Sequence, residues 1–438
     1  MKRYFRYIGV YAAVIAALYL FMVLAAAIPN DAIKKNMADS ARSYSNADQY
    51  VFTDDGKMRN VTDNYADVLW LNISWNMGDD NPFTAALDTK YYDGEKLGNM
   101  VGLYMTVTKN MAANTNYTRY WHGTAGVLRV MHLFTDVSGA KTIGFAVLVL
   151  LILKTMWRLI RDGHLDIALC LALSLIFVQV WNVRLSIEYL PSFLICFALC
   201  PSFLRRERRG DHCVECLAAV SGLLTSFFDF LTTETVTILL PLILIIVVRI
   251  KEERLGERKE VFKFLLRCLV LWGAAYGAAF LIKWSAVSLV TGENHFALAL
   301  SSAARRVDGT VTVGLAREKA GAIRALGANF SVLFGGKDRT SYGRAALGLA
   351  AFGIVIAFAL CLCKGSRKKQ GTGYILLLGS VVLLRYCVLA NHAYMHSFFT
   401  YRALASTIIA VLSALVLKLR PIKKAGEING TDHSDALS

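Results

Sequence analysis

Apolar residues occur along this chain in long stretches separated by short polar connectors. About 18 to 25 apolar residues are enough for an α-helix to cross a hydrocarbon core about 30 Å thick. Such stretches begin within the first dozen residues and recur almost to the end. The pattern predicts an all-α, polytopic integral membrane protein with about ten transmembrane helices. The predicted spans are 7–28, 140–157, 165–183, 187–204, 214–232, 235–250, 264–288, 345–363, 373–390 and 397–417.

The composition agrees with this prediction. Of the 438 residues, 55% are hydrophobic and 18% are charged, which is too apolar for a soluble domain of this length. The short connectors 156–163, 205–210, 249–259 and 364–369 are basic, as are both ends of the chain. The positive-inside rule therefore places these connectors and both termini in the cytoplasm. The net charge of +16 then reflects topology and contact with anionic membrane lipids, and nothing in the sequence indicates nucleic-acid binding.

The first apolar stretch has an alternative interpretation as a signal peptide. Met1, Lys2 and Arg3 precede it, and it ends in "AAAIPN". Its apolar run is longer than the hydrophobic region of a usual signal peptide. We therefore expect a retained membrane anchor.

Two long segments interrupt the pattern of short connectors, and the predicted orientation places both outside the cytoplasm. Residues 29–139 form the first extracytoplasmic loop, with amphipathic helices, and residues 289–344 form a second, basic one. Long loops carry function more often than they determine the fold. Neither loop contains a cysteine, so we expect no disulfide there. Residues 1–424 thus make one polytopic membrane domain, and 425–438 a disordered cytoplasmic tail.

Polar residues gather at the predicted outer ends of three spans. An isolated charge in apolar sequence is costly, so these groups are expected to face a shared cavity that opens outward. The alternative is that each turn lies in the membrane interface, where Tyr, Trp, His and Arg are common. The residues are Glu188, Asp229, Asn391, His392, His396 and Arg402.

The first loop supplies candidate acid and base groups. Helical spacing from Asp63 onward places Asp63 and Asp67 on one face, four residues apart. Two like charges at that spacing repel unless they meet a cation or one stays protonated. The pair suits a general base or a metal ligand, and a solvated helix face is the alternative.

Further along this loop, "RYWHG" combines Arg119, Trp121 and His122 with a flexible glycine. Flat rings stack on sugars, and a guanidinium binds phosphate oxygens, so the segment is a candidate binding site for both. An interfacial aromatic belt uses nearly the same residues.

The second loop is rich in Arg and Lys, beginning with Arg305 and Arg306. This excess lies on the side of the membrane where the topology rule does not require it. Binding of a donor phosphate explains it, because Arg holds phosphate oxygens through paired donors. Contact with anionic headgroups or solvent is the alternative.

In layout, most of the chain resembles the GT-C superfamily of membrane glycosyltransferases. The resemblance rests on the long first outer loop with acidic residues, the short-looped spans and the late second loop. It is supported by the blocks "DNYADVLWLN", "YTRYWHG", "FFDFLTTETVTILLPL" and "NHAYMHSFFTYRAL", which look like segments of bacterial proteins of this kind.

The resemblance implies transfer of a sugar from a polyprenyl-phosphate donor to an extracytoplasmic glycan, lipid or protein. It places the base on a first-loop carboxylate, here Asp63 or Asp67, with Asp31 as an alternative nearer the first span. A divalent metal such as Mg or Mn assists some members, so the resemblance allows one here, and the sequence does not assign its ligands. His392 and His396 lack the third ligand that zinc requires.

Two other functions compete with this one. A transporter or flippase of a lipid-linked glycan also needs an outward polar cavity, although it is expected to carry polar groups at the membrane midplane. A glycan polymerase or ligase shares the chemistry and differs only in donor and acceptor.

Overall fold

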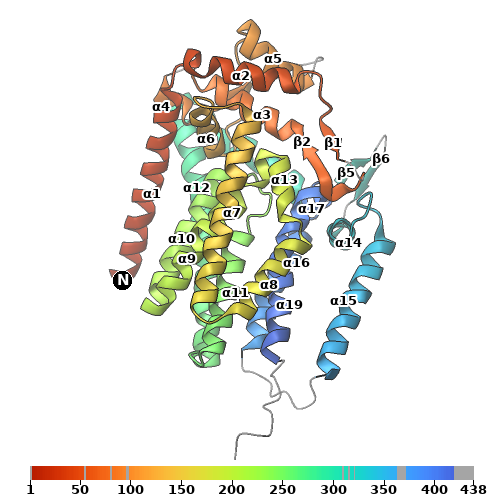
Figure 1. The fold of residues 1–438 in the computed structure, drawn as a ribbon. Helices are drawn as coiled ribbons and strands as arrows, with labels where there is room; N and C mark the ends of the chain where they lie inside the picture. The colour runs from red at the N-terminus through yellow and green to blue at the C-terminus, as the bar shows by residue number, and fades with distance from the viewer. Residues whose placement is uncertain are drawn as a thin grey trace, which may run out of the picture.

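The computed structural model describes residues 2–53, 56–78, 81–94, 98–307, 310–313, 316–319, 321–362 and 371–418. These described residues are 78% helix and 3% strand, which confirms the predicted all-α class. The predicted tail 425–438 lies outside the described residues. Figure 1 shows a bundle of long helices with a smaller layer of short helices and hairpins across one end.

Every predicted span overlaps a helix of the bundle. Among the described residues, five helices are long and apolar enough to cross a membrane: Phe5–Ala26, Val137–Arg161, Ile187–Arg209, Arg258–Thr291 and Ser397–Lys418. Leu165–Phe177 and Thr372–Val388 are apolar but shorter. The fold is therefore compatible with a membrane protein. The bundle helices are α1 (Lys2–Ala26), α7 (Val137–Arg161), α8 (Leu165–Phe177), α9 (Pro191–Arg206), α10 (Asp211–Phe228), α11 (Val236–Lys251), α12 (Arg258–Thr291), α15 (Tyr342–Leu362), α16 (Thr372–Val388) and α19 (Ala405–Lys418).

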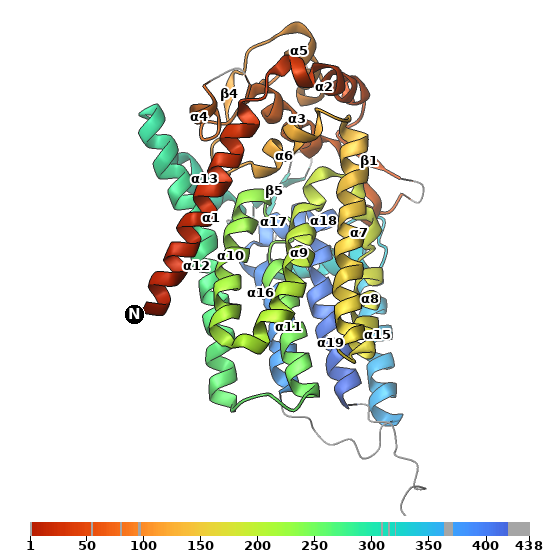
Figure 2. The same cartoon turned by 60° about the vertical axis from the view of Figure 1, so that its left-hand side comes forward.

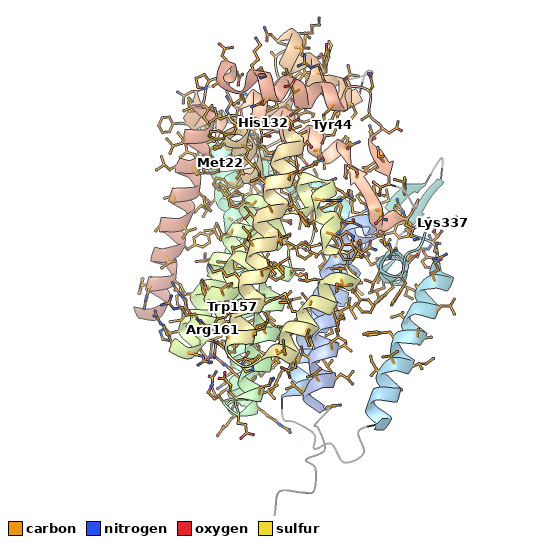
Figure 3. All side chains as sticks on the ribbon, in the orientation of Figure 1. Met22, Tyr44, His132, Trp157, Arg161 and Lys337 are labelled. Atoms are coloured by element: carbon orange, nitrogen blue, oxygen red, sulfur yellow. The ribbon has the colours of Figure 1, made fainter. Side chains whose placement is uncertain are left out.

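Helix α11 forms the centre of the bundle, and its residues from Val236 to Val248 are all buried. The peripheral helices α1, α7 and α12 instead expose large apolar side chains, including Leu24, Leu150 and Val270. Exposed apolar surface on this scale is typical of contact with lipid or another protein. Figure 3 shows Trp157 and Arg161 on α7 near the end of the bundle opposite Tyr44.

The first outer loop folds into a layer across one end of the bundle, here called the cap (Figure 2). The strand pairs β1–β2 and β3–β4 are antiparallel, with Tyr50 opposite Asp63 in the first. The predicted helix after Asp63 is confirmed as α3, which is buried along nearly its whole length. The elements of the cap are α2 (Asn30–Tyr44), β1 (Tyr50–Phe52), η1 (Met58–Asn60), β2 (Val61–Asp63), α3 (Asn64–Asn76), α4 (Pro82–Ala85), β3 (Lys90–Tyr91), α5 (Gly98–Lys109), β4 (Thr115–Asn116) and α6 (Gly123–Met131).

One buried cation holds the cap to the first helix. The Arg129 guanidinium is inaccessible to solvent and donates to the carbonyl oxygens of Ala25 at 3.0 Å and Ser74 at 2.6 Å, and to Asn30 Oδ1 at 2.7 Å. The carbonyls belong to the C-terminal turns of α1 and α3, where helix dipoles favour positive charge. The cap therefore contacts the bundle through specific polar bonds as well as through apolar packing.

The second outer loop contains α13 (His295–Val307), β5 (Thr310–Val313), β6 (Ala316–Lys319) and α14 (Ala322–Leu333). Asn329 of α14 donates to the Ala393 carbonyl oxygen at 2.9 Å and accepts from Thr400 at 2.7 Å. The Met58 amide donates to the Gly336 carbonyl oxygen at 3.3 Å. The two outer loops and the segment before α19 thus lie together.

The segment from the end of the ninth predicted span into the start of the tenth is broken into short pieces. These are α17 (Ala390–Met395), α18 (Ser397–Thr400) and η6 (Tyr401–Leu404), and the regular helix α19 begins only at Ala405. A similar break, η3 (Val180–Leu185) and η4 (Ile187–Tyr189), separates α8 from α9. Both breaks contribute residues to the site described next.

Candidate functional site

A cavity of about 220 Å³ lies between the cap and the bundle. Five residues predicted as site residues meet there: Asp63, Arg119, Glu188, His392 and His396. They come from four separate parts of the chain. The remaining lining residues are Tyr50, Tyr65, Ala66, Leu69, Tyr91, Tyr117, Tyr120, Phe230 and Phe399.

Asp63 and Glu188 form a pair of hydrogen-bonded carboxyl groups in this cavity. Both are more than nine-tenths buried. Asp63 is the N-cap of α3, and its Oδ1 accepts from the Ala66 amide at 2.9 Å, while its own amide donates to Ser186 Oγ at 2.6 Å. Among the described residues no Lys or Arg forms an ion pair with either carboxyl group. Since a hydrogen bond needs a donor, one of the two groups must carry a proton.

Burial shifts the proton equilibrium of Asp63 toward the neutral form, compared with an aspartate in water. Burial raises the pKa of Asp63 to about 6, and hydrogen bonds from the Ala66 amide and from Glu188 oppose that rise. A carboxyl group with a pKa near 6 is largely ionised at neutral pH and still binds a proton readily. Asp63 therefore has the properties of a general base.

Asp67 lies in a different environment and does not line the cavity. It is fully buried and forms an ion pair with Lys141 of α7. Its carboxylate also accepts from the Tyr44 hydroxyl at 2.9 Å and from the Ile187 amide at 2.7 Å. Asp63 is the N-cap of α3 and does not have the helical backbone conformation, so Asp63 and Asp67 do not lie on one helix face as predicted. Asp67 joins α3 to α2, α7 and η4.

Of the three residues predicted from "RYWHG", only Arg119 lines the cavity. Its guanidinium lies 4.4 Å from the centre of the Tyr117 ring and donates to the Tyr117 hydroxyl at 2.9 Å. The Trp121 indole donates to the Ala279 carbonyl oxygen of α12 at 2.7 Å and stacks on Phe227. Trp121 thus anchors the cap to the bundle.

His122 is fully buried beside the cavity among aromatic rings, including those of Trp70 and Phe230. Its Nε2 lies 2.7 Å from the Tyr117 carbonyl oxygen. Burial, together with the nearby Lys283 ammonium, lowers the pKa of His122 well below its usual value. The imidazole is therefore neutral and supports the aromatic wall of the cavity.

The cavity also contains a histidine pair from α17 and its end. The ring centres of His392 and His396 are 4.7 Å apart, and His396 stacks on Phe399 at 5.2 Å. Asn391 precedes the pair but does not line the cavity. In the part of the chain that the structure describes, no group of three or more His, Cys, Asp or Glu is arranged to hold a metal ion.

Arg402 and Asp229 are both buried behind the cavity wall. The Arg402 guanidinium lies 4.6 Å from the centre of the Tyr189 ring and donates to the carbonyl oxygens of Phe398 and Arg59. Asp229 accepts from Ser192 Oγ at 2.8 Å and from the Thr232 amide at 2.9 Å. Neither side chain lines the cavity, and the predicted substrate-binding role of each stays a prediction.

The structure also shows a buried ion pair that the sequence analysis did not identify. Arg385 of α16 contacts both carboxylate oxygens of Glu234, at 2.7 and 3.2 Å, and donates to the Leu231 carbonyl oxygen at 2.9 Å. The pair fixes the α10–α11 turn next to Phe230. An arginine within an apolar span was the available signal.

Two predicted residues of the second loop have only their backbone described. Arg305 and Arg306 lie in α13, and their side chains are outside the described part of the structure. Their proposed contact with phosphate stays a prediction. Asp31, the alternative base, is exposed in the first turn of α2 and does not line the cavity.

A groove of about 390 Å³ lies beside the cavity, and nearly all of its surface is apolar. On α7 its lining runs from Ala140 to Leu151, a rise of about 16 Å, or roughly half of the hydrocarbon core. Ile187 lines the groove and the next residue, Glu188, lines the cavity, so the groove and the cavity are adjacent at η4. The groove is lined by Thr124, Val127, Leu128, Met131, Ala140, Lys141, Gly144, Val147, Leu151, Ile187, Leu190, Pro191, Leu194, Ile195, Ala198, Leu199, Leu224 and Phe228.

Comparisons of the chain with protein-family models, with curated proteins and with solved structures found no match.

Proposed function

We propose that the protein is a membrane glycosyltransferase that moves a sugar from a polyprenyl-phosphate donor to an extracytoplasmic glycan, lipid or protein. The observation that carries the proposal is the position of the polar cavity. It holds a buried carboxyl pair, a guanidinium and two imidazoles, and it borders an apolar groove long enough for part of a lipid chain.

The proposed topology follows from the ends of the bundle. The cap lies at one end, and the basic connectors around Arg161, Arg205 and Arg249 lie at the other, as Figure 3 shows for Arg161. By the positive-inside rule, the basic end is cytoplasmic and the cap is outside. With all ten bundle helices crossing the membrane, both termini are cytoplasmic.

In the proposed reaction, Asp63 accepts the proton of the acceptor hydroxyl while that oxygen bonds to the anomeric carbon. The bond from this carbon to the donor phosphate breaks, and its electron pair leaves with the phosphate. Arg119 and the two histidines stabilise the growing negative charge. The tyrosines of the cavity stack on the sugar ring.

A flippase is the second candidate, because it too would hold a lipid in the groove. Arg385 and Glu234, which are buried near the cavity, form an ion pair with each other, so neither charge is left uncompensated for a passing headgroup. The two functions differ in their product. A transferase releases polyprenyl phosphate, whereas a flippase moves the donor intact across the membrane.

The test compares the wild type with Asp63→Asn in detergent or nanodiscs, using a panel of labelled polyprenyl-phosphate sugars. General-base catalysis contributes on the order of 100-fold or more, so release of polyprenyl phosphate should fall by at least that factor. Asp39→Asn, at an exposed position of α2, is the matched control and should keep full activity. No release from any donor by the wild type, or full release by Asp63→Asn, would refute the proposal.

Activity and stability should respond to pH in opposite directions. The pKa of Asp63 is raised to about 6 in the folded protein, so the folded state binds this proton where the unfolded chain does not. Between about pH 4 and pH 6, stability from this group therefore falls as pH rises. Turnover should rise over the same window because the base must lose its proton. Unfolding and turnover profiles measured on one sample, with Asp63→Asn as reference, check this.

A further inference from the structure

We propose that Glu188 is a positioning residue that shares one proton with Asp63, so that the carboxyl pair works as a base only in its singly protonated form. This inference rests on the transferase function proposed above. It assigns a defined role to Glu188, which lies in a connector between two bundle helices and is 125 residues away from Asp63 along the chain.

The geometry supports a shared proton. The two carboxyl groups are in hydrogen-bond contact although both are acidic and both are buried. Among the described residues, no N–H or O–H donor reaches the buried Glu188 Oε1. Two ionised carboxylates in hydrogen-bond contact would repel strongly, and a single proton between them removes the repulsion.

The surrounding charges leave this proton in place. Asp67, the nearest other carboxylate, is neutralised by Lys141, and Asp229 is held by Ser192 and Thr232. Among the described residues, neither Asp63 nor Glu188 forms an ion pair with a Lys or Arg side chain. The titratable groups around the pair are Tyr50 of β1, Asp67 of α3, Arg119 of the cap, Tyr189 of η4, Asp229 before α11, His392 of α17, His396 after α17, and Arg402 of η6.

The shared proton explains how a buried aspartate serves as a base. The proton stays on Glu188 and its hydrogen bond orients the Asp63 carboxylate. Asp63 then takes the acceptor proton, and the pair passes from one negative charge to neutral, while the negative charge moves to the leaving phosphate. Product release and loss of one proton to solvent restore the starting state. No oxidant, metal or further reactant enters the balance.

Two ionisations of one pair give a bell-shaped dependence of turnover on pH. The rising limb marks the loss of the first proton and the falling limb the loss of the shared one. Glu188→Gln keeps a hydrogen-bond donor that cannot ionise, so the falling limb should disappear and the rising limb should move to lower pH. Glu188→Leu removes the donor and should move the rising limb upward by on the order of one pH unit.

The decisive measurement is turnover against pH for the wild type, Glu188→Gln and Glu188→Leu. A purely structural Glu188 would give lower turnover with an unchanged profile, so a falling limb retained by a well-folded Glu188→Gln would overturn the proposal. The expected turnover of Glu188→Gln at its optimum is within about tenfold of the wild type.

Infrared difference spectroscopy provides a readout that needs no substrate. At neutral pH, the wild-type minus Glu188→Gln spectrum should contain the band of one protonated carboxyl group, and the wild-type minus Asp39→Asn spectrum should not. Absence of the band from the first spectrum overturns the shared proton whether or not a donor has been found. Presence of the band without activity on any donor refutes the transferase function and leaves the carboxyl pair established.

Discussion

The ion pair between Lys141 and Asp67 supplies a quantitative test of how the site is held together. Lys141→Met keeps most of the apolar stem of the side chain but leaves the Asp67 carboxylate buried without its cation. Removing one partner of a buried ion pair typically costs about 3 to 5 kcal/mol. The side chain of Asp67 is fully buried and that of Lys141 is 15% exposed, so solvent screening is small.

Two hydrogen bonds, from the Tyr44 hydroxyl and the Ile187 amide, still stabilise the lone carboxylate. We therefore expect the lower end of that range, about 3 kcal/mol. The assay is unfolding of the detergent-solubilised protein by denaturant. The matched control is Lys154→Met, an exposed lysine on the same helix, with an expected change within about 0.5 kcal/mol.

The double variant Lys141→Met with Asp67→Asn separates the ion pair from other effects. In this double variant neither side chain is charged. Its loss of stability should be smaller than the sum of the two single losses by a coupling energy of about 1 to 3 kcal/mol. Equal stability of Lys141→Met and the wild type, or strictly additive single changes, would show that this ion pair does not hold α3 to α7.

Two further predictions test the groove and the helix packing. Leu151→Trp should fill the groove and raise the KM for long-chain donors about tenfold. Leu150→Trp, on the exposed face of α7, should leave this KM unchanged. Equal KM values for the two variants would show that the groove does not bind the donor. Gly222→Ala should destabilise by about 1 to 3 kcal/mol because its Cβ would lie 2.2 Å from the Trp272 carbonyl oxygen. Gly273→Ala, which meets nothing within 4 Å, is the control, and equal unfolding curves would contradict the close packing.

The sequence contains enough information to predict the helices and part of the site. Apolar stretches predicted the bundle because burial in lipid or in a helical core needs continuous apolar surface. Glu188, His392 and His396 were predictable as a group because each places a polar side chain where a span ends. The structure brings these three together with Asp63.

Other predicted residues lie elsewhere for reasons that no local pattern contains. The spacing of Asp63 and Asp67 indicated one helix face, but the N-cap has its own backbone conformation, and a lysine 74 residues away neutralises Asp67. Arg402 indicated a cavity, yet its guanidinium lies over the Tyr189 ring and donates to backbone carbonyl oxygens. The cavity tyrosines come from strands, connecting segments and the first turn of α3, and their meeting depends on contacts across the whole chain.

The anchoring of the cap has a consequence for how the protein is made. The Trp121 indole reaches the Ala279 carbonyl oxygen of α12, 158 residues later, and the Thr124 hydroxyl reaches the Phe228 carbonyl oxygen, 104 residues later. In the topology proposed above, the cap is exported early in translation and therefore stays partly assembled until α12 has been synthesised. During that interval the insertion machinery has to cover the apolar surfaces of the cap. Ribosomal pauses before α12 should therefore lengthen the time in which proteases can cleave it.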